Sequence, residues 1–139
     1  MSPLLIKFKP RHEPEFEDVW AGTYCTFAKE KSKGDIYVFG LNNYNQLGLE
    51  EQKCHFHPMV SEVFSGKNWV QICGGQHHTL ALDSEGIIYA LGRKEYGRLG
   101  LGEDCDDTEK PTALTTLADK KCIDISCGSD VSFAVTDKG

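Results

Sequence analysis

The feature that most constrains this chain is an internal repeat of about 50 residues. Three segments share a glycine, a short polar stretch and an apolar run, and their glycines Gly22, Gly75 and Gly128 are each 53 residues apart. Downstream positions such as Gly40 and Gly92 match at a spacing of 52. A fixed period of roughly 20–50 residues is typical of solenoids, propellers and other repeat architectures. Each unit is therefore expected to be one supersecondary structure packed against its neighbours.

Each unit predicts four short antiparallel strands. In the second unit they are expected at residues 69–73, 79–82, 87–91 and near 111–117, with a turn ending at Gly86 between the second and the third. These segments are rich in β-branched and aromatic residues, and no segment keeps apolar residues at helical spacing. The sequence predicts an all-β fold, a partial β-propeller of four-stranded antiparallel blades.

The repeat divides the chain into four parts. Residues 1–15 are a lead-in with room for the last strand of a preceding blade, and residues 16–66 and 67–119 are the first and second repeats. Residues 120–139 are a truncated third repeat. Even a four-bladed ring needs about 160–200 residues at roughly 40–50 per blade, whereas this chain has 139. An incomplete sector of a ring is therefore expected.

An open sector has ends that no neighbouring blade covers. The second unit has neighbours on both sides, so the region of Tyr24, Phe39, Trp69 and Tyr89 is expected to be packed best. The outer faces of the first and third units are expected to expose apolar side chains and unpaired strands, which favour association.

Charge and cysteine content limit the classes of partner and compartment. Lys and Arg number 15 against 21 Asp and Glu, a net charge of −6, and nucleic-acid affinity depends mainly on neutralising phosphates, so strong direct DNA binding is not expected. The apolar run Leu4–Ile6 is too short for a signal peptide or a membrane span, so no membrane association is expected. Without a secretory signal, the six cysteines are expected to be free thiols, and Cys25, Cys73 and Cys127 to be small core residues.

The second unit also carries a specific motif. Residues 75–82 read Gly-Gln-His-His-Thr-Leu-Ala-Leu, residues 88–92 read Ile-Tyr-Ala-Leu-Gly, and residues 96–100 read Tyr-Gly-Arg-Leu-Gly. This order resembles the repeat of the regulator of chromosome condensation family, which runs G-x-x-H-S/T-L-A-L, a D/E-G turn, V-Y-A-W-G and N-x-x-G-Q-L-G. The resemblance extends over residues 16–139.

Two features of that repeat are altered in this chain. Phe39 and Leu91 replace the tryptophan before the third-strand glycine, and Cys25 and Val131 replace the repeat histidine in the first and third units. Degenerate repeats are normal in propellers, so the expected fold is unchanged.

The resemblance implies a seven-bladed ring, of which this chain holds about two and a half repeats. It also implies guanine-nucleotide exchange on the Ran GTPase, in the nucleus on chromatin, by binding alone and without covalent chemistry or a cofactor. Histones and the nucleosome would be engaged by regions outside this chain, so little exchange activity is expected from it alone. The alternative is a non-catalytic propeller scaffold for protein interaction, because a fold does not determine a function.

Five polar residues of the second unit are candidate site residues. His77 lies at a variable position beside the repeat histidine, and the resemblance places it on the GTPase-binding face as an exchange contact. His78 is expected to be structural, with its ring hydrogen-bonded within the blade. Arg93, Glu95 and Arg98 lie in the loop after the third strand, where the arginines could pair with partner carboxylates; a solvated loop is the alternative.

The other polar segments do not predict a metal site. The segment Cys54–His57 holds three potential metal ligands, but no second ligand pair follows at a suitable spacing, so no metal is expected. The acidic loop 103–109 lacks the spacing of a calcium-binding loop, and either faces a basic partner such as a histone or is solvated. The repeat positions expected to be structural are Gly22, Gly40, Gly75, Gly92 and Gly128.

Overall fold

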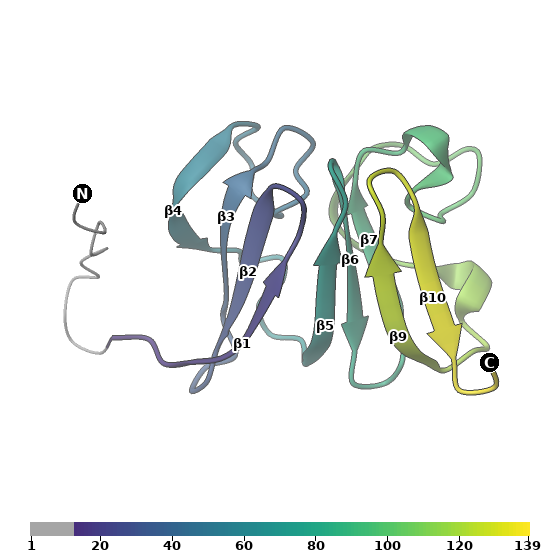
Figure 1. Ribbon diagram of the computed structural model, residues 1–139, viewed down its shortest axis with the longest axis horizontal. Helices are drawn as coiled ribbons and strands as arrows, with labels where there is room; N and C mark the ends of the chain where they lie inside the picture. The colour runs from purple at the N-terminus through teal and green to yellow at the C-terminus, as the bar shows by residue number, and fades with distance from the viewer. Residues whose placement is uncertain (1–12) are drawn as a thin grey trace.

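The computed structural model describes residues 13–139, and Figure 1 shows them as successive antiparallel sheets. The first sheet has the order β1-β2-β3-β4 and the second the order β5-β6-β7-β8. The third contains β9 and β10 in the described part of the chain. The strands are β1 (Phe16–Ala21), β2 (Cys25–Glu30), β3 (Ile36–Leu41), β4 (Cys54–Val60), β5 (Trp69–Gly74), β6 (His78–Asp83), β7 (Ile88–Gly92), β8 (Thr108–Ala113), β9 (Cys122–Cys127) and β10 (Ser132–Thr136).

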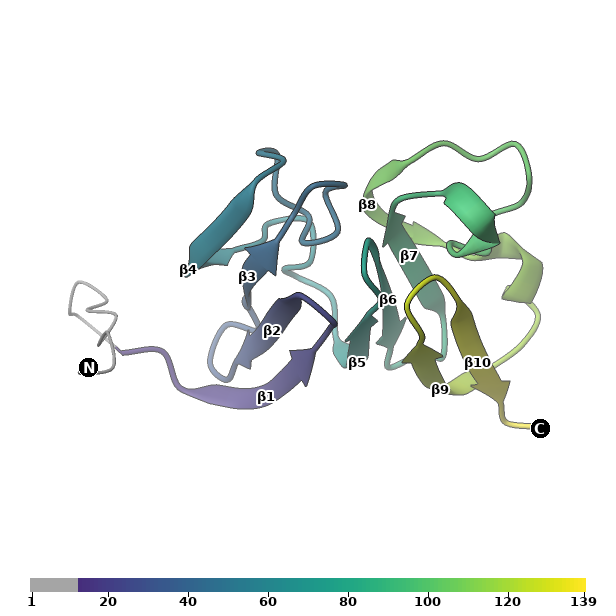
Figure 2. The same ribbon diagram turned by 45° about the horizontal axis from the view of Figure 1, so that its top comes forward.

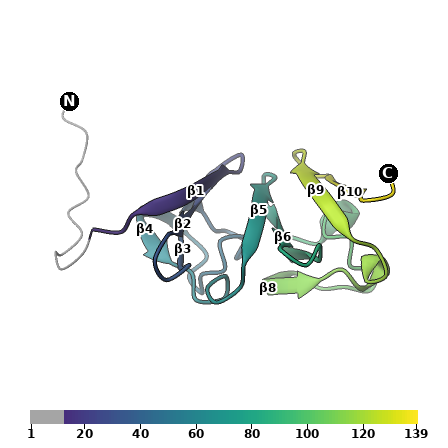
Figure 3. The ribbon, with the colours of Figure 1, turned by 90° about the horizontal axis from the view of Figure 1, so that it is seen from below.

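This architecture confirms the predicted all-β sector of a propeller. Figure 3 shows the first strands of the three sheets, β1, β5 and β9, side by side along one edge. Gly22 and Gly74 form an isolated parallel bridge where the first sheet meets the second. A strand preceding β1 was predicted within residues 1–15, of which 1–12 lie outside the described residues. The division into units 16–66, 67–119 and 120–139 remains an interpretation of the repeat.

The last strand of the second sheet begins and ends earlier than predicted. β8 occupies Thr108–Ala113, and a short 3-10 helix, η2 (Thr115–Leu117), follows it. Pro111 is tolerated within β8 because no described strand pairs with its outer edge, so its missing N–H breaks no ladder. The amide of Leu114 donates to the carbonyl of Ile88 at 2.9 Å, and the Leu114 side chain then enters the core. The segment predicted as strand thus turns inward to cover the sheet.

Two apolar clusters hold the sheets together. Between the first and second sheets, Phe64 packs edge-to-face on both Phe27 and Trp69, and the Trp69 indole N–H donates to the Phe64 carbonyl at 2.6 Å. The second cluster joins Leu80 of β6 and Ile88 of β7 to residues of β9. Trp69 is buried as expected, but the prediction is wrong for Tyr24, which lies in the β1–β2 turn and is 54% exposed.

The third sheet exposes several large apolar side chains. Phe133 and Val135 of β10, Ile123 of β9 and Val131 between them are exposed large hydrophobic residues. On the first sheet, Val19 of β1 is exposed in the same way. Both observations agree with the expectation that the ends of an open sector present apolar surface. Among residues 13–139, no helix is long and apolar enough to cross a bilayer.

Gly92 is a glycine because backbone from a neighbouring strand fills the space beside it. Its φ is +112°, a value that L side chains rarely adopt. A Cβ added there would meet the carbonyl oxygen of His77 and lie 2.8 Å from the Cα of His78. Gly40, its equivalent in the first sheet, has a φ of +114° and the same crowding against Tyr24.

We expect Gly92→Ala to lower the free energy of unfolding by about 2 kcal/mol or more, because strain and a backbone clash add together. The matched control is Gly102→Ala, since Gly102 also has a positive φ (+98°) but no atom within 4 Å of an added Cβ. This control should cost about 1 kcal/mol from backbone strain alone. Urea unfolding of the two variants measures the difference, and equal losses would contradict the proposed clash.

Candidate functional site

The connections that follow the first and third strands of each sheet gather at one end of the molecule. Figures 1 and 2 show the loops after β3 and β7 at this end, which is the top of the view in Figure 1. Antiparallel order within each sheet places the β5–β6 and β9–β10 turns there as well. We call this surface the loop face, and it comprises residues 22–24, 42–53, 75–77, 93–107 and 128–131.

Three side chains on the loop face form one contiguous cluster between the first two units. The His77 ring packs edge-to-face on Tyr44, with ring centroids 5.2 Å apart. The Arg93 guanidinium also lies over Tyr44, 4.9 Å from the centroid of its ring. The amide of Arg93 also donates to the carbonyl of His77 at 2.9 Å. These contacts define the Tyr44–His77–Arg93 cluster and limit the rotation of the imidazole.

The environment of His77 favours its neutral form. Desolvation lowers the pKa of His77 below its ordinary value, and the positive charges of Arg98 and Arg93 lower it further. The Nδ1 atom is buried without a hydrogen-bond partner among the described residues. A neutral imidazole carries one donor and one acceptor nitrogen. His77 is therefore a half-buried neutral side chain whose Nδ1 is enclosed, so only Nε2 remains to donate or accept a hydrogen bond.

His78 is structural, but its hydrogen bond reaches the next sheet rather than its own. The ring is buried, and its Nε2 lies 2.9 Å from the hydroxyl of Ser132 in β10. Ser132 donates its single proton to the carbonyl of Arg98 at 2.6 Å, so His78 must be the donor to Ser132. The prediction of a bond within the blade is wrong because the β6 side chain points across the interface toward β10.

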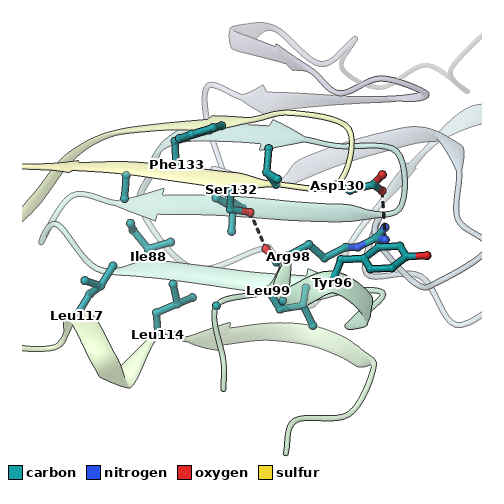
Figure 4. Close-up of a pocket in the computed structure, with 14 residues that line it drawn as sticks. Ile88, Tyr96, Arg98, Leu99, Leu114, Leu117, Asp130, Ser132 and Phe133 are labelled. Carbon is teal, nitrogen blue, oxygen red and sulfur yellow. Dashed lines mark hydrogen bonds and ion pairs between the residues drawn. The ribbon is translucent and has the colours of Figure 1, made fainter. Parts of the chain in front are cut away.

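Arg98 is not available to a partner carboxylate, which corrects its assignment as a partner-binding residue. Its side chain is 1% exposed, and its Nη2 lies 3.1 Å from Asp130 Oδ1 in the β9–β10 turn (Figure 4). Its Nε donates to the Glu95 carbonyl at 2.7 Å. The next residue, Leu99, is fully buried in the second apolar cluster, and Arg98 is buried beside it. Arg98 thus joins the second unit to the third.

Figure 4 also shows a pocket beside this ion pair. Ile88, Leu99 and Leu114 line a pocket that ends at Phe133 of β10, while Arg98 and Asp130 lie at its polar end. The lining is mostly apolar, and Phe133 is exposed. The pocket therefore lies between the second sheet and β10.

Arg93 and Glu95 remain on the surface, as the sequence suggested. They pair with each other through Arg93 Nη2 and Glu95 Oε2, and the pair lowers the pKa of Glu95. The short 3-10 helix η1 (Glu95–Gly97) begins in this loop. Lys94 ties the loop to the acidic segment, because its amide donates to Asp107 at 2.8 Å. A role for Arg93 and Glu95 in binding a partner remains a prediction.

Sequence reasoning missed Tyr44 and Asp130. Asp130 occupies in the third unit the position that His77 occupies in the second, two residues after the repeat glycine. Tyr44 recurs as Tyr96 at the repeat spacing of 52. Comparing equivalent positions across units would therefore have found both residues, although it would not have shown which side chains they contact.

The residues described give no metal site. Within residues 13–139, no group of three or more His, Cys, Asp or Glu side chains is placed to hold an ion. Cys54 and His57 are exposed, whereas His55 is buried and its Nε2 lies 3.0 Å from the Glu51 carbonyl. These side chains of β4 do not converge on one point.

The sequence matches the Regulator of chromosome condensation (RCC1) repeat over residues 33–82 and 85–135, most of the chain. The chain belongs to the regulator of chromosome condensation family. It is 43% identical over 136 residues to the Regulator of chromosome condensation of Xenopus laevis, covering 96% of this chain and 31% of that protein. The chain therefore spans about a third of the length of this relative.

The same repeat occurs in relatives with other names and in solved structures. The Ultraviolet-B receptor UVR8 of Arabidopsis thaliana is 34% identical over 105 residues, which cover 76% of this chain and 24% of the receptor. The crystal structure of Prp20p from Saccharomyces cerevisiae superposes with a TM-score of 0.71 at 24% identity. The match covers 91% of this chain and 31% of that one, and it supports the fold alone.

We expect Arg93→Gln to raise the pKa of His77 toward its ordinary value, because the substitution removes one of the positive charges that disfavour the imidazolium. An NMR titration of the imidazole signals measures the change. Lys94→Gln is the matched control: it removes a positive charge from the next residue, and Lys94 is not among the groups that lower this pKa. An unchanged or lower pKa in Arg93→Gln would contradict the assigned environment.

Proposed function

We propose that this chain is a sector of a guanine-nucleotide exchange factor for the Ran GTPase, acting in the nucleus on chromatin. The observation that carries the proposal is the position of His77. It lies on the loop face, held by Tyr44 and Arg93, at the place where the family resemblance expects an exchange contact. The 43% identity to the Regulator of chromosome condensation of Xenopus laevis supports the same role.

The proposed mechanism is binding without covalent chemistry. A factor that binds the nucleotide-free GTPase more tightly than the loaded form weakens nucleotide binding by the same free energy. This coupling needs a broad polar surface rather than a reaction pocket. The loop face offers the neutral imidazole of His77 and the ion pair between the half-buried Arg93 and the exposed Glu95. Arg98 contributes indirectly, because its ion pair with Asp130 fixes the loop that carries Arg93.

The chain by itself is expected to have little exchange activity. It spans 31% of the Xenopus laevis relative, so most of the loop surface of a complete ring is contributed by other blades. The buried contact area would be correspondingly small, and affinity depends on a few well-placed groups within a large interface. Histones and the nucleosome are proposed to contact other parts of the ring, and the net charge of −6 argues against direct DNA binding by this part.

A non-catalytic interaction scaffold is the second candidate. The observation in its favour is the match to a receptor, UVR8, which shows that this repeat also occurs in proteins with a different name and role. A scaffold would use the same loop face to bind a partner without altering the partner's affinity for nucleotide.

The test is release of a fluorescent guanine nucleotide from Ran by the complete propeller that carries this sequence. We expect His77→Ala to slow release about tenfold, equivalent to about 1.4 kcal/mol of lost transition-state stabilisation. His57→Ala is the matched control, because His57 is an exposed histidine on β4 and takes no part in the Tyr44–His77–Arg93 cluster. Unchanged release by a folded His77→Ala propeller would remove His77 from the site, and Ran binding without accelerated release would favour the scaffold.

A further inference from the structure

The interface between the second and third sheets repeats one contact pattern along its length. Three residue pairs are in contact at a separation of 54 positions: the Gln71 side chain with the Ile125 backbone, and the side chains of Cys73 with Cys127 and of His78 with Ser132. We call these pairs the second seam. The uniform offset means that β5 and β6 face β9 and β10 in a fixed register.

The outer two pairs of the second seam hold the central pair in place. The Gln71 amide donates from Nε2 to the Ile125 carbonyl at 2.9 Å and accepts from the Ile125 amide at 3.1 Å. This bidentate contact fixes β9 two residues before Cys127. On the other side, the buried His78 ring binds Ser132. The two thiols therefore lie between two well-defined hydrogen-bonded contacts, on strands that are themselves paired within their sheets.

The thiols of Cys73 and Cys127 are close enough to react with each other. Their sulfur atoms are 2.9 Å apart, and both cysteines are free. A disulfide has a sulfur–sulfur distance of about 2.05 Å, so an approach of less than about one ångström forms the bond. Both residues are half-buried rather than fully enclosed, which leaves a route for a small oxidant.

We propose that Cys73 and Cys127 are a redox-sensitive pair that forms a reversible disulfide joining the second blade to the third. The proposed oxidant is a small-molecule disulfide such as glutathione disulfide. This inference rests on the second seam alone and is independent of the proposed exchange function.

The reaction is a two-step thiol–disulfide exchange. The Cys127 thiolate attacks one sulfur of glutathione disulfide, forms a mixed disulfide and releases one glutathione thiolate. Cys73 then loses its proton and attacks the Cys127 sulfur, which forms the bond between the two cysteines and releases the second glutathione. Two protein thiols lose two electrons and two protons in total, and the small disulfide gains both to become two thiols.

The surroundings of the pair agree with this order of events. The Cys73 thiol donates a hydrogen bond that lowers the pKa of Cys127, and the nearby His78 ring acts in the same direction. The same hydrogen bond and burial raise the pKa of Cys73. A thiolate is the nucleophile in such exchange, so Cys127 is the attacking group.

Cys25 and Cys122 do not compete for this reaction within the fold. Burial raises the pKa of Cys25 to about 12, which keeps this thiol protonated. Cys122 lies on β9 but is buried, and its pKa is also raised by burial. Cys54 is exposed and serves as an internal indicator that the oxidant has reacted.

The bond would act on the least covered part of the molecule. In the described chain, β9 and β10 form a two-stranded sheet with an exposed outer face, held mainly by its contact with β5 and β6. A disulfide across 54 positions restricts the unfolded chain and so raises the stability of the folded state. Oxidation would therefore fasten the terminal unit to the second blade.

The experiment treats the reduced 139-residue chain with glutathione disulfide at low protein concentration, alkylates the remaining thiols and maps disulfide-linked peptides by mass spectrometry. Trypsin alone leaves Cys122 and Cys127 on one peptide, so a second cleavage before Asp124 is needed. We expect a Cys73–Cys127 link and a higher thermal midpoint after oxidation. Cys122→Ser, the matched control on β9, should keep both effects, whereas Cys73→Ser and Cys127→Ser should lose them.

Each variant is compared with its own reduced form, so any loss of stability from the substitution itself cancels. The proposal is overturned if Cys54 becomes glutathionylated while Cys73 and Cys127 are both alkylated, because the oxidant then acted and the pair did not. It is also overturned if the links formed are intermolecular, if they join Cys73 or Cys127 to another cysteine, or if the midpoint rises equally in Cys73→Ser.

Discussion

Each sheet of this chain buries its apolar side chains mainly against the neighbouring sheets, and this constraint governs the rest of the structure. A single four-stranded sheet has too little interior for a core, so stability comes from the interfaces between successive units. Trp69 shows the consequence: it belongs to the second sheet, yet it completes the cluster around Phe27 and Phe64 of the first unit. The interfaces also fix how one unit is oriented relative to the next.

The two interfaces within this chain solve the same packing problem with different chemistry. Where the first sheet meets the second, Gly22 and Gly74 let the backbones of neighbouring units form a bridge, and aromatic rings fill the remaining space. Where the second meets the third, Gln71, Cys73 and His78 each reach a partner across the gap. In the first interface, the glycine backbones and the aromatic rings fit together by shape. The second interface combines the apolar cluster around Leu80 and Ile88 with polar and thiol groups, whose contacts depend on protonation and redox state.

The loop face inherits its geometry from these interfaces. His77 contacts Tyr44 of the first unit, while its sequence neighbour His78 contacts Ser132 of the third. His77 and His78 are adjacent in the sequence, and together they contact the first and third units from the second. The loop face at this point is therefore held by contacts with all three units. The ion pair of Arg98 with Asp130 adds a further link between the second and third units. These contacts restrain the loops of this surface, and a pre-organised surface suits recognition of a large partner.

The sequence by itself determined the architecture and the family, because the repeat spacing and the positions of Gly40 and Gly92 reflect local backbone requirements that recur in the first and second units. It also predicted a structural role for His78, whose ring is buried in the fold. It misjudged Arg98, the partner of His78 and the exposure of Tyr24. The burial of Arg98 and the partner of His78 depend on which side chains meet across the interface between the second and third units, 32 and 54 positions apart in the sequence. Periodicity within one unit contains no information on such contacts, and only the tertiary packing decided them.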